Sequence, residues 1–413
     1  MRNKRILFIN SIVGTGSTGR LISGLCGMLS KKDTDTLVCY GRGRADDSVA
    51  TFRIGRDFDV YMHGVMSRIT DRHGLYSTGP TRILLKVIDA FEPDLIHLHN
   101  LHGYYLNYST LMRYLKKKRI PIVWTLHDCW AFTGHCTHFE YAGCDRWKTD
   151  GCHDCSELRE YPRSVCRDAS RENFLLKKEL FTGFDDLRIV TPSNWLKERV
   201  GESFLSEYGI DVIPTGIDLA TFRKKESDIK KRYGIEGKKV ILGVANPWRD
   251  RKGLDEFIRL SSLLPDEFRI VMIGLKKSQL SLIPESITAI EKTESIEEMV
   301  RWYSAAELFL NLTREDTFPT TNIEALACGC PVITYRAGGS PESLDESCGR
   351  VVKIDDLEEV VRLIRNDSWR DQETRENCRK RSLIYDRKER YLQYYRLCYG
   401  QYLEDTDEEH QKI

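Results

Sequence analysis

The feature that most constrains the fold is an alternation of short β-branched apolar runs with amphipathic helical patterns, which begins near residue 6 and restarts near residue 240. The runs expected to form strands are residues 6–10, 37–40, 95–99, 122–126, 187–191, 212–214, 240–245, 268–274, 308–310 and 332–334. Short apolar strands that alternate with helices are typical of parallel sheets covered on both faces. The 413 residues also exceed what one core usually holds. The sequence therefore predicts an α/β protein with two doubly wound domains and a hinge near residues 215–219.

Composition excludes several classes of function. The net charge of +1 gives no general attraction to nucleic acid. No stretch approaches the roughly 18 apolar residues of a membrane span. The chain runs almost at once into the strand at residues 6–10, without an apolar leader, so we expect a cytoplasmic protein. The 13 cysteines then indicate thiols or metal ligands rather than a disulfide framework.

Residues 314–342, REDTFPTTNIEALACGCPVITYRAGGSPE, carry the most specific functional pattern. Asp316 and Glu324 are separated by seven residues, and Pro319 between them suits the first turn of a helix. Gly329 suits the stop of that helix. The N-terminus of a helix attracts phosphates, and carboxylates accept hydrogen bonds from vicinal hydroxyls. Together these features indicate a site for a nucleotide-sugar.

This segment resembles the donor-site motif of glycosyltransferase family 4, the retaining group 1 enzymes of the GT-B fold that serve bacterial polysaccharide biosynthesis. That motif has two acidic residues around an aromatic-glycine pair, followed by a helix and a Cys-Gly-x-Pro-Val-Ile run. Here Asp316 replaces the usual first Glu, and Pro319 stands where Gly is common. The shorter side chain of Asp changes the reach of the first carboxylate, which affects the choice of sugar.

The resemblance implies two Rossmann-like domains that face each other across a cleft. An acceptor-side domain would span residues 1–216 and a donor-binding domain residues 217–387. A C-terminal helix, residues 388–408, would return to the first domain. The tyrosines between residues 391 and 402 have near-helical spacing and are expected to form its packing face.

A glycine string, Gly14-x-Gly16-x-x-Gly19, follows the first predicted strand. Glycine permits positive φ and close approach of a backbone to a ligand. A dinucleotide site would need an acidic residue at the end of the second strand, and Tyr40-Gly41-Arg42 supplies none. The resemblance assigns Gly14 and Gly16 to the donor diphosphate and the catalytic centre, and a tight turn without a ligand remains the alternative.

The loop of residues 244–253, VANPWRDRKG, follows the first strand of the second domain. It resembles the basic loop in which family 4 enzymes hold the donor diphosphate with an Arg and a Lys. Lys252 matches the Lys, and Arg251 is preferred to Arg249 for the Arg. Cations are needed there because negative charge develops on the leaving diphosphate. A solvated surface cluster is the alternative.

His127 comes directly after a predicted strand and matches the histidine that family 4 enzymes place beside the donor sugar. A structural histidine is the alternative. The resemblance thus implies a catalytic set and a substrate-binding set. The catalytic residues would be His127, Asp316, Lys252 and Arg251, and the substrate-binding residues Gly14, Gly16, Arg249, Phe318, Thr320, Thr321 and Glu324.

Residues 129–156 form a cysteine-rich insertion in the first domain. Cys136, Cys144, Cys152 and Cys155 could form a tetrahedral structural zinc site that holds a loop with little core of its own. Free buried thiols and redox chemistry are the other interpretations. A closed site with four ligands leaves no open position, so we expect no metal in catalysis.

A histidine cluster and a basic run are less specific signals of function. His97, His99 and His102 end a predicted strand, and structural or acceptor-side roles are favoured over metal binding. The basic run Lys116–Arg119 ends a helix. It could be a solvated helix terminus or a contact with an anionic membrane.

The implied activity is retaining transfer of a hexosyl group from a UDP- or GDP-sugar to a saccharide or lipid-linked acceptor, at the inner face of the membrane and without a catalytic cofactor. Two alternatives from other classes remain. Nucleotide-sugar 2-epimerases share the architecture, and fold does not determine function. A non-enzymatic, zinc-stabilised binding module is the other alternative.

Overall fold

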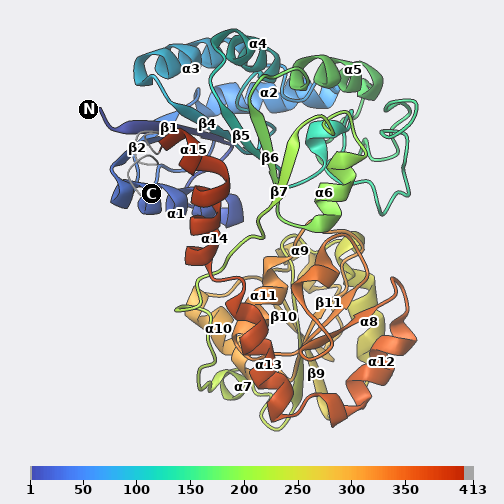
Figure 1. Cartoon of the computed structure of the whole chain (residues 1–413). Helices are drawn as coiled ribbons and strands as arrows, with labels where there is room; N and C mark the ends of the chain where they lie inside the picture. The colour runs from blue at the N-terminus through green and yellow to red at the C-terminus, as the bar shows by residue number, and fades with distance from the viewer. Residues whose placement is uncertain (1, 404–413) are drawn as a thin grey trace. The chain divides into compact units, whose positions relative to one another are not determined.

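A computed structural model describes residues 2–403, and the chain divides into two compact units. Unit 1 is Met1–Ile213 with Tyr391–Ile413, and unit 2 is Pro214–Arg390. Each unit is a parallel sheet between two layers of helices (Figure 1). This confirms the predicted α/β class with two doubly wound domains.

The sheet of unit 1 has seven strands in the order β3-β2-β1-β4-β5-β6-β7, all parallel. Its strands are β1 (Lys4–Asn10), β2 (Thr34–Tyr40), β3 (Thr51–Arg53), β4 (Leu95–Leu98), β5 (Ile122–Thr125), β6 (Leu187–Thr191) and β7 (Gly209–Val212). Its helices are α1 (Gly16–Leu29), α2 (Asp57–Thr70), α3 (Thr78–Phe91), α4 (Tyr108–Lys118), α5 (Ser170–Phe181), α6 (Asn194–Gly201), the end of α14 (Arg387–Tyr394) and α15 (Gly400–Leu403).

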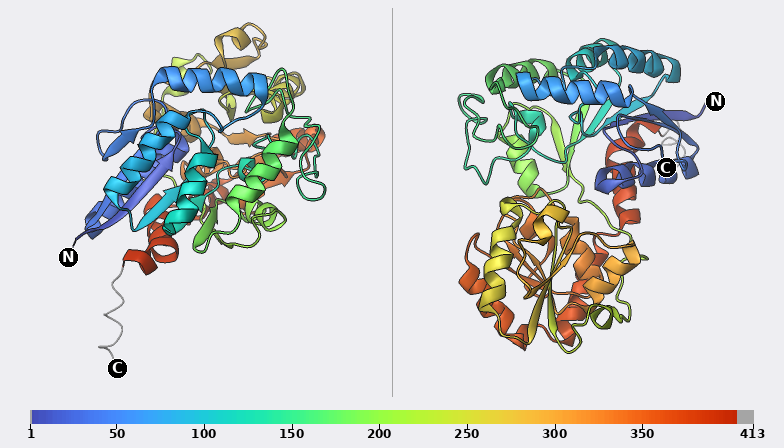
Figure 2. Two further views of the ribbon diagram at one scale, coloured as in Figure 1. Left: turned by 90° about the horizontal axis from the view of Figure 1, so that it is seen from above. Right: turned by 180° about the vertical axis from the view of Figure 1, so that it is seen from behind.

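Alternate residues of each strand enter two separate cores, because side chains in a strand point to opposite faces. Ile6 and Phe8 of β1 pack with α1 and with Tyr394 and Tyr399 of the C-terminal segment. The other face of the sheet packs against α3, α4 and α5. Figure 2 shows these two layers. The C-terminal tyrosines are therefore a packing face, as expected, and residues 404–408 of the predicted helix lie outside the described residues.

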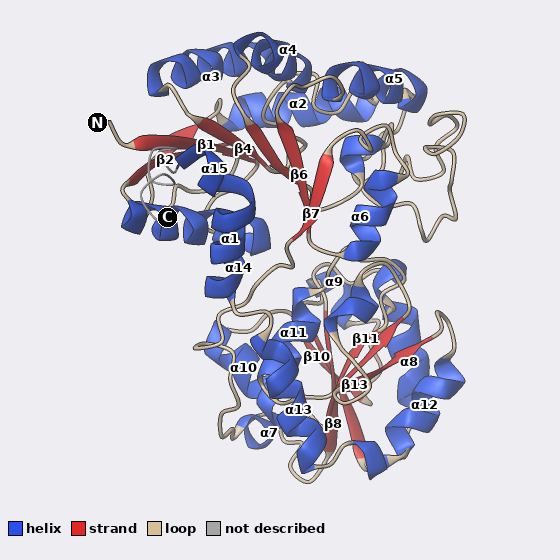
Figure 3. Cartoon of the chain, viewed as in Figure 1, coloured by secondary structure: helices blue, strands red, loops and turns tan. Residues whose placement is uncertain are grey.

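The sheet of unit 2 has six parallel strands in the order β10-β9-β8-β11-β12-β13. They are β8 (Lys239–Val244), β9 (Phe268–Ile273), β10 (Ile287–Ile290), β11 (Leu308–Asn311), β12 (Val332–Tyr335) and β13 (Gly349–Val352). The helices are α7 (Ile229–Arg232), α8 (Leu254–Leu263), α9 (Lys277–Leu280), α10 (Ile296–Ala305), α11 (Thr320–Ala327), α12 (Leu357–Arg365), α13 (Gln372–Leu383) and the start of α14. Helices α8 and α12 cover one face, and α10, α11 and α13 cover the other (Figure 3).

Three strands were not predicted, and neither were five helices: α5, α7, α9, α12 and α13, of which α5 and α13 have 12 residues each. No residue of β3 is buried, and the two middle residues of β10 and of β13 are partly exposed, so these strands lack the continuous apolar run on which the predicted strands were recognised. Helix α5 is rich in charge, and its buried face even includes Lys177. The last strand of unit 1 ends at Val212, so it lies earlier in the chain than the predicted run at residues 212–214.

Among residues 2–403, no helix is long and apolar enough to cross a lipid bilayer.

Candidate active site

Unit 2 brings two of the predicted catalytic residues into direct contact. Lys252 ends the short 3₁₀ helix η3 (Asp250–Lys252) after β8, and Asp316 follows β11, the neighbouring strand. Lys252 Nζ lies 2.8 Å from Asp316 Oδ2. Both side chains keep part of their surface exposed, 31% for the lysine and 23% for the aspartate. A cation and a carboxylate thus meet at the carboxyl edge of the sheet, where ligands of open α/β sheets bind.

The segment from Asp316 to Glu324 has the helix start that its sequence predicts. Helix α11 begins at Thr320 after Pro319, and the N-cap makes no side-chain hydrogen bond to the first turn. Between Leu312 and Ala327, four of the five residues predicted to hold the donor have partly exposed surface, and every other residue is buried. The partly exposed residues are Asp316, Thr320, Thr321 and Glu324. These four residues therefore keep access to solvent, whereas polar neighbours such as Glu315 and Asn322 are buried. The fifth, Phe318, is only 7% exposed and packs against Tyr385, so the prediction that it lines the donor site is not supported by its position.

Glu324 has a partner that the sequence did not indicate. The hydroxyl of Tyr303, on α10, donates a hydrogen bond to Glu324 Oε2 at 3.1 Å. Tyr303 is fully buried, and burial together with the Glu324 carboxylate raises its pKa well above the ordinary value. The phenol therefore stays protonated and orients the carboxylate.

The two candidate arginines of the basic loop differ in their surroundings. The Arg251 guanidinium forms an ion pair with Glu315, whose side chain is only 2% exposed. The backbone carbonyl of Arg251 also accepts a hydrogen bond of 2.8 Å from the Arg314 amide. Arg249 is exposed. A carboxylate thus already faces the guanidinium that was predicted to bind the diphosphate, so a phosphate there would share Arg251 with Glu315.

In unit 1 the glycine string forms the turn between β1 and α1. Gly14 and Gly16 have φ values of +68° and +64°, which favour glycine. The first turn of α1 has no acidic side chain, and Thr15 provides no side-chain cap. A side chain at position 14 would also collide with Asp46, whose Oδ2 would lie 2.9 Å from a Cβ atom. The turn leaves the N–H groups of the first helical turn without a local anionic partner from that turn.

His127 follows β5 and is partly exposed. Its Nε2 lies 3.0 Å from Nδ1 of His99, which follows the adjacent strand β4. Burial lowers the pKa of His127 to about 4, although the neighbouring Asp128 carboxylate raises it. His127 is therefore a neutral imidazole near pH 7.

Next to His127, a second polar chain extends from Asp128. Its Oδ2 lies 2.9 Å from His102 Nε2, and His102 Nδ1 lies 3.0 Å from the Tyr161 hydroxyl. Burial alone would raise the pKa of the Asp128 carboxyl, but His102 lowers it to about 2. His97 bonds to Thr125 and to Tyr399 instead, so the histidine cluster supplies internal hydrogen bonds.

The cysteine-rich insertion gathers its thiols but does not present a formed metal site. A hydrogen bond joins the side chains of Cys136 and Cys155, which lowers the pKa of Cys155. The Gly134 amide donates to Cys152 Sγ at 3.1 Å. Across the part of the chain that the structure describes, no group of three or more His, Cys, Asp or Glu side chains is placed to hold a metal ion. Zinc binding therefore stays a prediction.

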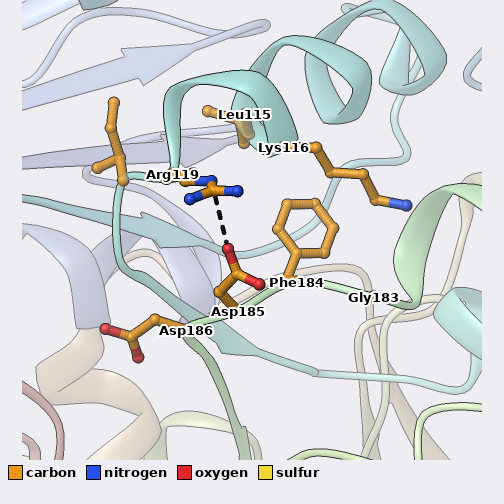
Figure 4. Close-up of a pocket in the computed structure, with 8 residues that line it drawn as sticks. Leu115, Lys116, Arg119, Gly183, Phe184, Asp185 and Asp186 are labelled. Atoms are coloured by element: carbon orange, nitrogen blue, oxygen red, sulfur yellow. Dashed lines mark ion pairs between the residues drawn. The ribbon is translucent and has the colours of Figure 1, made fainter.

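The basic run Lys116–Arg119 forms the C-terminal end of α4 and precedes β5, so it lies away from the carboxyl ends of the strands. It borders a surface pocket formed with the segment before β6 (Figure 4). Arg119 pairs with Asp185 at 3.5 Å, Lys118 pairs with Asp89 at 2.5 Å, and Lys116 Nζ donates to a backbone carbonyl at 2.9 Å. These pairings favour a solvated helix terminus over a membrane contact.

Known proteins resemble this chain in sequence and in fold. The profile of the family described as Glycosyltransferase Family 4 matches residues 19–221, and that of Glycosyl transferases group 1 matches residues 238–366. The colanic acid biosynthesis glycosyl transferase WcaC of Escherichia coli (strain K12) is 29% identical over 282 residues, which cover 66% of this chain and 67% of that protein.

Solved structures share the fold. Sucrose-phosphate synthase from Thermosynechococcus elongatus has a TM-score of 0.70 at 15% identity and covers 97% of this chain and 99% of its own. Anabaena Alr3699/HepE in complex with UDP-glucose has a TM-score of 0.65 at 14% identity, with 95% and 98% covered. Two family profiles in the expected order, on two doubly wound units with the motif residues at the strand ends, show that the chain belongs to the group 1 glycosyltransferases, with the GT-B fold.

Proposed function

We propose that this glycosyltransferase moves a hexosyl group, with retention, from a UDP- or GDP-sugar to a saccharide or lipid-linked acceptor in cell-surface polysaccharide biosynthesis. The setting is supported by the likeness to WcaC, a protein named for colanic acid biosynthesis. The donor class is supported by the fold shared with a protein solved in complex with UDP-glucose.

The single observation that carries the proposal is the Lys252–Asp316 contact at the start of α11. Lysine is a point charge suited to phosphate, and a carboxylate accepts hydrogen bonds from sugar hydroxyls. Backbone N–H groups at the start of a helix add further donors for an anion. In a nucleotide-sugar, phosphate groups and sugar hydroxyls lie next to each other, so such a ligand fits a lysine beside a carboxylate.

Each residue then has a role. Lys252, Arg251 and the N–H groups around Thr320 and Thr321 hold the diphosphate and stabilise the charge that develops on it. Asp316 accepts from hydroxyls of the transferred sugar. Glu324, oriented by the Tyr303 hydroxyl, accepts from the ribose hydroxyls.

Retention follows if the acceptor approaches the face from which the diphosphate leaves. The bond between the anomeric carbon and the phosphate oxygen breaks, and the acceptor oxygen bonds to the same face. The acceptor's proton passes to the departing phosphate, so no protein side chain need act as a nucleophile. The oxocarbenium-like pair is short-lived, and exclusion of water limits hydrolysis of the donor.

A panel of UDP- and GDP-sugars tests the proposal. Slow release of free nucleotide from one donor, lost in Lys252→Ala, is the expected result. A donor epimerised at C2 without nucleotide release would identify a 2-epimerase. Neither turnover nor binding of any donor would favour a binding module.

We also propose that lipid-linked acceptors are met at the inner face of the membrane. Helix α2 exposes apolar side chains at helical spacing, with exposed fractions of 69% for Phe58, 67% for Tyr61, 39% for Met62 and 47% for Ile69. The exposed Arg68 lies on the same helix. Aromatic and basic side chains on one helix are typical of interfacial contacts.

Sedimentation with vesicles tests the membrane contact. Binding to anionic vesicles, weaker to neutral ones and reduced in Phe58→Ser/Tyr61→Ser, is expected. Equal recovery of the double variant and the unaltered protein with anionic vesicles would contradict this role of α2.

A further inference from the structure

His99 is held rigidly beside His127. Its backbone amide donates to the Ile9 carbonyl at 3.0 Å, and its own carbonyl accepts from Trp124 Nε1 at 3.0 Å. The side chain is 1% exposed and packs against Phe8 and His97. The ring position is therefore determined by the strands β1, β4 and β5 rather than by a ligand.

The two imidazoles form an in-plane hydrogen bond. His99 Nδ1 and His127 Nε2 are 3.0 Å apart, and the ring planes differ by only 14°. Ring hydrogens and lone pairs lie in the ring plane, so this arrangement aligns a donor with an acceptor. Burial lowers the pKa of both rings, which makes both neutral near pH 7. One hydrogen therefore lies between them, on one ring or the other.

The second nitrogen of His99 decides which ring carries it. His99 Nε2 is buried and has no hydrogen-bond partner among residues 2–403. A neutral imidazole has one N–H and one lone pair. A hydrogen on Nε2 would leave a buried N–H without an acceptor, which native structures rarely tolerate. An unmatched lone pair at Nε2 is the less costly state, so the hydrogen belongs on Nδ1 and is donated to His127.

We propose that His99 is a positioning residue that fixes His127 in the tautomer with its hydrogen on Nδ1, which makes His127 a neutral hydrogen-bond donor rather than a base. Because His127 Nε2 accepts from His99, its own hydrogen must lie on the other nitrogen. The acceptor for this Nδ1 hydrogen rests on the proposed function, in which it is an oxygen of the donor sugar or of the leaving phosphate. A neutral donor at this position stabilises developing negative charge without a proton transfer.

The tautomer can be measured on the free, full-length protein by ¹⁵N–¹H correlation spectra of histidine-labelled enzyme. We expect the His127 Nδ1 signal in the range of protonated ring nitrogens and Nε2 in the range of unprotonated ones. The signal is assigned by its loss in His127→Gln. A protonated Nε2 in the unaltered enzyme would overturn the proposal. This readout needs no substrate, so it stands or fails separately from the proposed function.

Two variants of His99 separate positioning from packing. His99→Asn keeps an N–H near the Nδ1 position, whereas His99→Phe keeps a ring without a donor. We expect His99→Phe to move the His127 hydrogen toward Nε2 and to lower kcat about tenfold at unchanged KM, the effect of one lost hydrogen bond in the transition state. His99→Asn should keep the Nδ1 hydrogen and most of kcat. Equal loss of kcat in both variants, with the His127 tautomer unchanged, would show a merely structural role.

Discussion

The two units share one architecture, but the polar side chains at the ends of their strands differ: neutral imidazoles occur in unit 1, and ion pairs occur in unit 2. All histidines of the described chain lie in unit 1, and residues 214–390 contain none. In unit 1 the polar groups after β4 and β5 include the imidazoles of His99 and His127, whose pKa values are lowered by burial. In unit 2 the groups after β8 and β11 are ion pairs, Lys252 with Asp316 and Arg251 with Glu315.

Under the proposed function, this difference fits a division of roles between the two units. Neutral imidazoles supply directional hydrogen bonds at low desolvation cost, which suits contacts with an uncharged sugar. Charged pairs suit a diphosphate, whose negative charge grows as the glycosidic bond breaks. Changes of pH and single substitutions test this contrast.

Acid should destabilise unit 1 before unit 2. The pKa values of His63, His73, His97, His99 and His127 are all lowered in the folded protein, to about 3 for His63 and about 4 for His127. Below pH 6.5 the unfolded chain binds protons that the folded unit does not, so stability falls as pH falls. Each histidine contributes up to about 1.4 kcal/mol per pH unit in this range.

Hydrogen exchange followed by mass spectrometry at pH 7 and pH 5 measures this, because it reads each unit separately. Unit 2 should keep its protection against exchange at pH 5. Its carboxyl groups with a lowered pKa, such as Asp255, are protonated, and so lose their stabilising charge, only below about pH 4. Loss of protection in unit 2 at a higher pH than in unit 1 would contradict the predicted order of acid destabilisation.

Lys252→Ala should have the next largest effect. Loss of the cation beside Asp316 should lower kcat/KM for donor turnover by about 10² to 10³. The melting temperature should hardly change, because the side chain is 31% exposed. Lys231→Ala, an exposed lysine on α7, is the matched control and should retain full activity. Retained turnover in Lys252→Ala would contradict the role of charged side chains of unit 2 in holding the diphosphate.

The metal content of the protein will show whether the cysteine-rich insertion is held together by a bound metal ion or by packing of free thiols. If zinc is bound, the purified protein should contain about one equivalent, and Cys152→Ser should lose both the metal and about 2 kcal/mol of stability. Elemental analysis and thermal unfolding check this, with Cys166→Ser, an exposed cysteine, as the control. Metal-free protein of normal stability would identify the cluster as buried thiols.

Tyr303→Phe should have the smallest effect. The variant removes one hydrogen bond to Glu324 without a change in shape, so KM for the donor should rise by about threefold to tenfold. We expect kcat to stay near that of the unaltered enzyme. Steady-state kinetics with the donor found in the screen provide the measurement. A loss as large as that of Lys252→Ala would mean that Tyr303 does more than orient a ribose contact.

The fold could be predicted largely from local pattern, while parts of the site could not. The β-branched runs and the helix signals around Pro319 and Gly329 specify elements through short-range propensity, and those elements formed at or near the predicted residues. Strands such as β13, whose two middle residues are partly exposed, lack the continuous apolar run that gives this signal. The partners of the motif residues, such as Glu315 for Arg251 and Tyr303 for Glu324, leave no local trace at all.

Periodicity, helix signals and spacing were sufficient to predict two parallel α/β sheets. They also placed Lys252 after a strand, Asp316 before a helix and Glu324 inside that helix. The contact between His99 and His127, in contrast, has no signal in the sequence and follows only from the assembled structure. Such contacts depend on which strands are neighbours. Strand order is a property of the assembled sheet and not of any single segment.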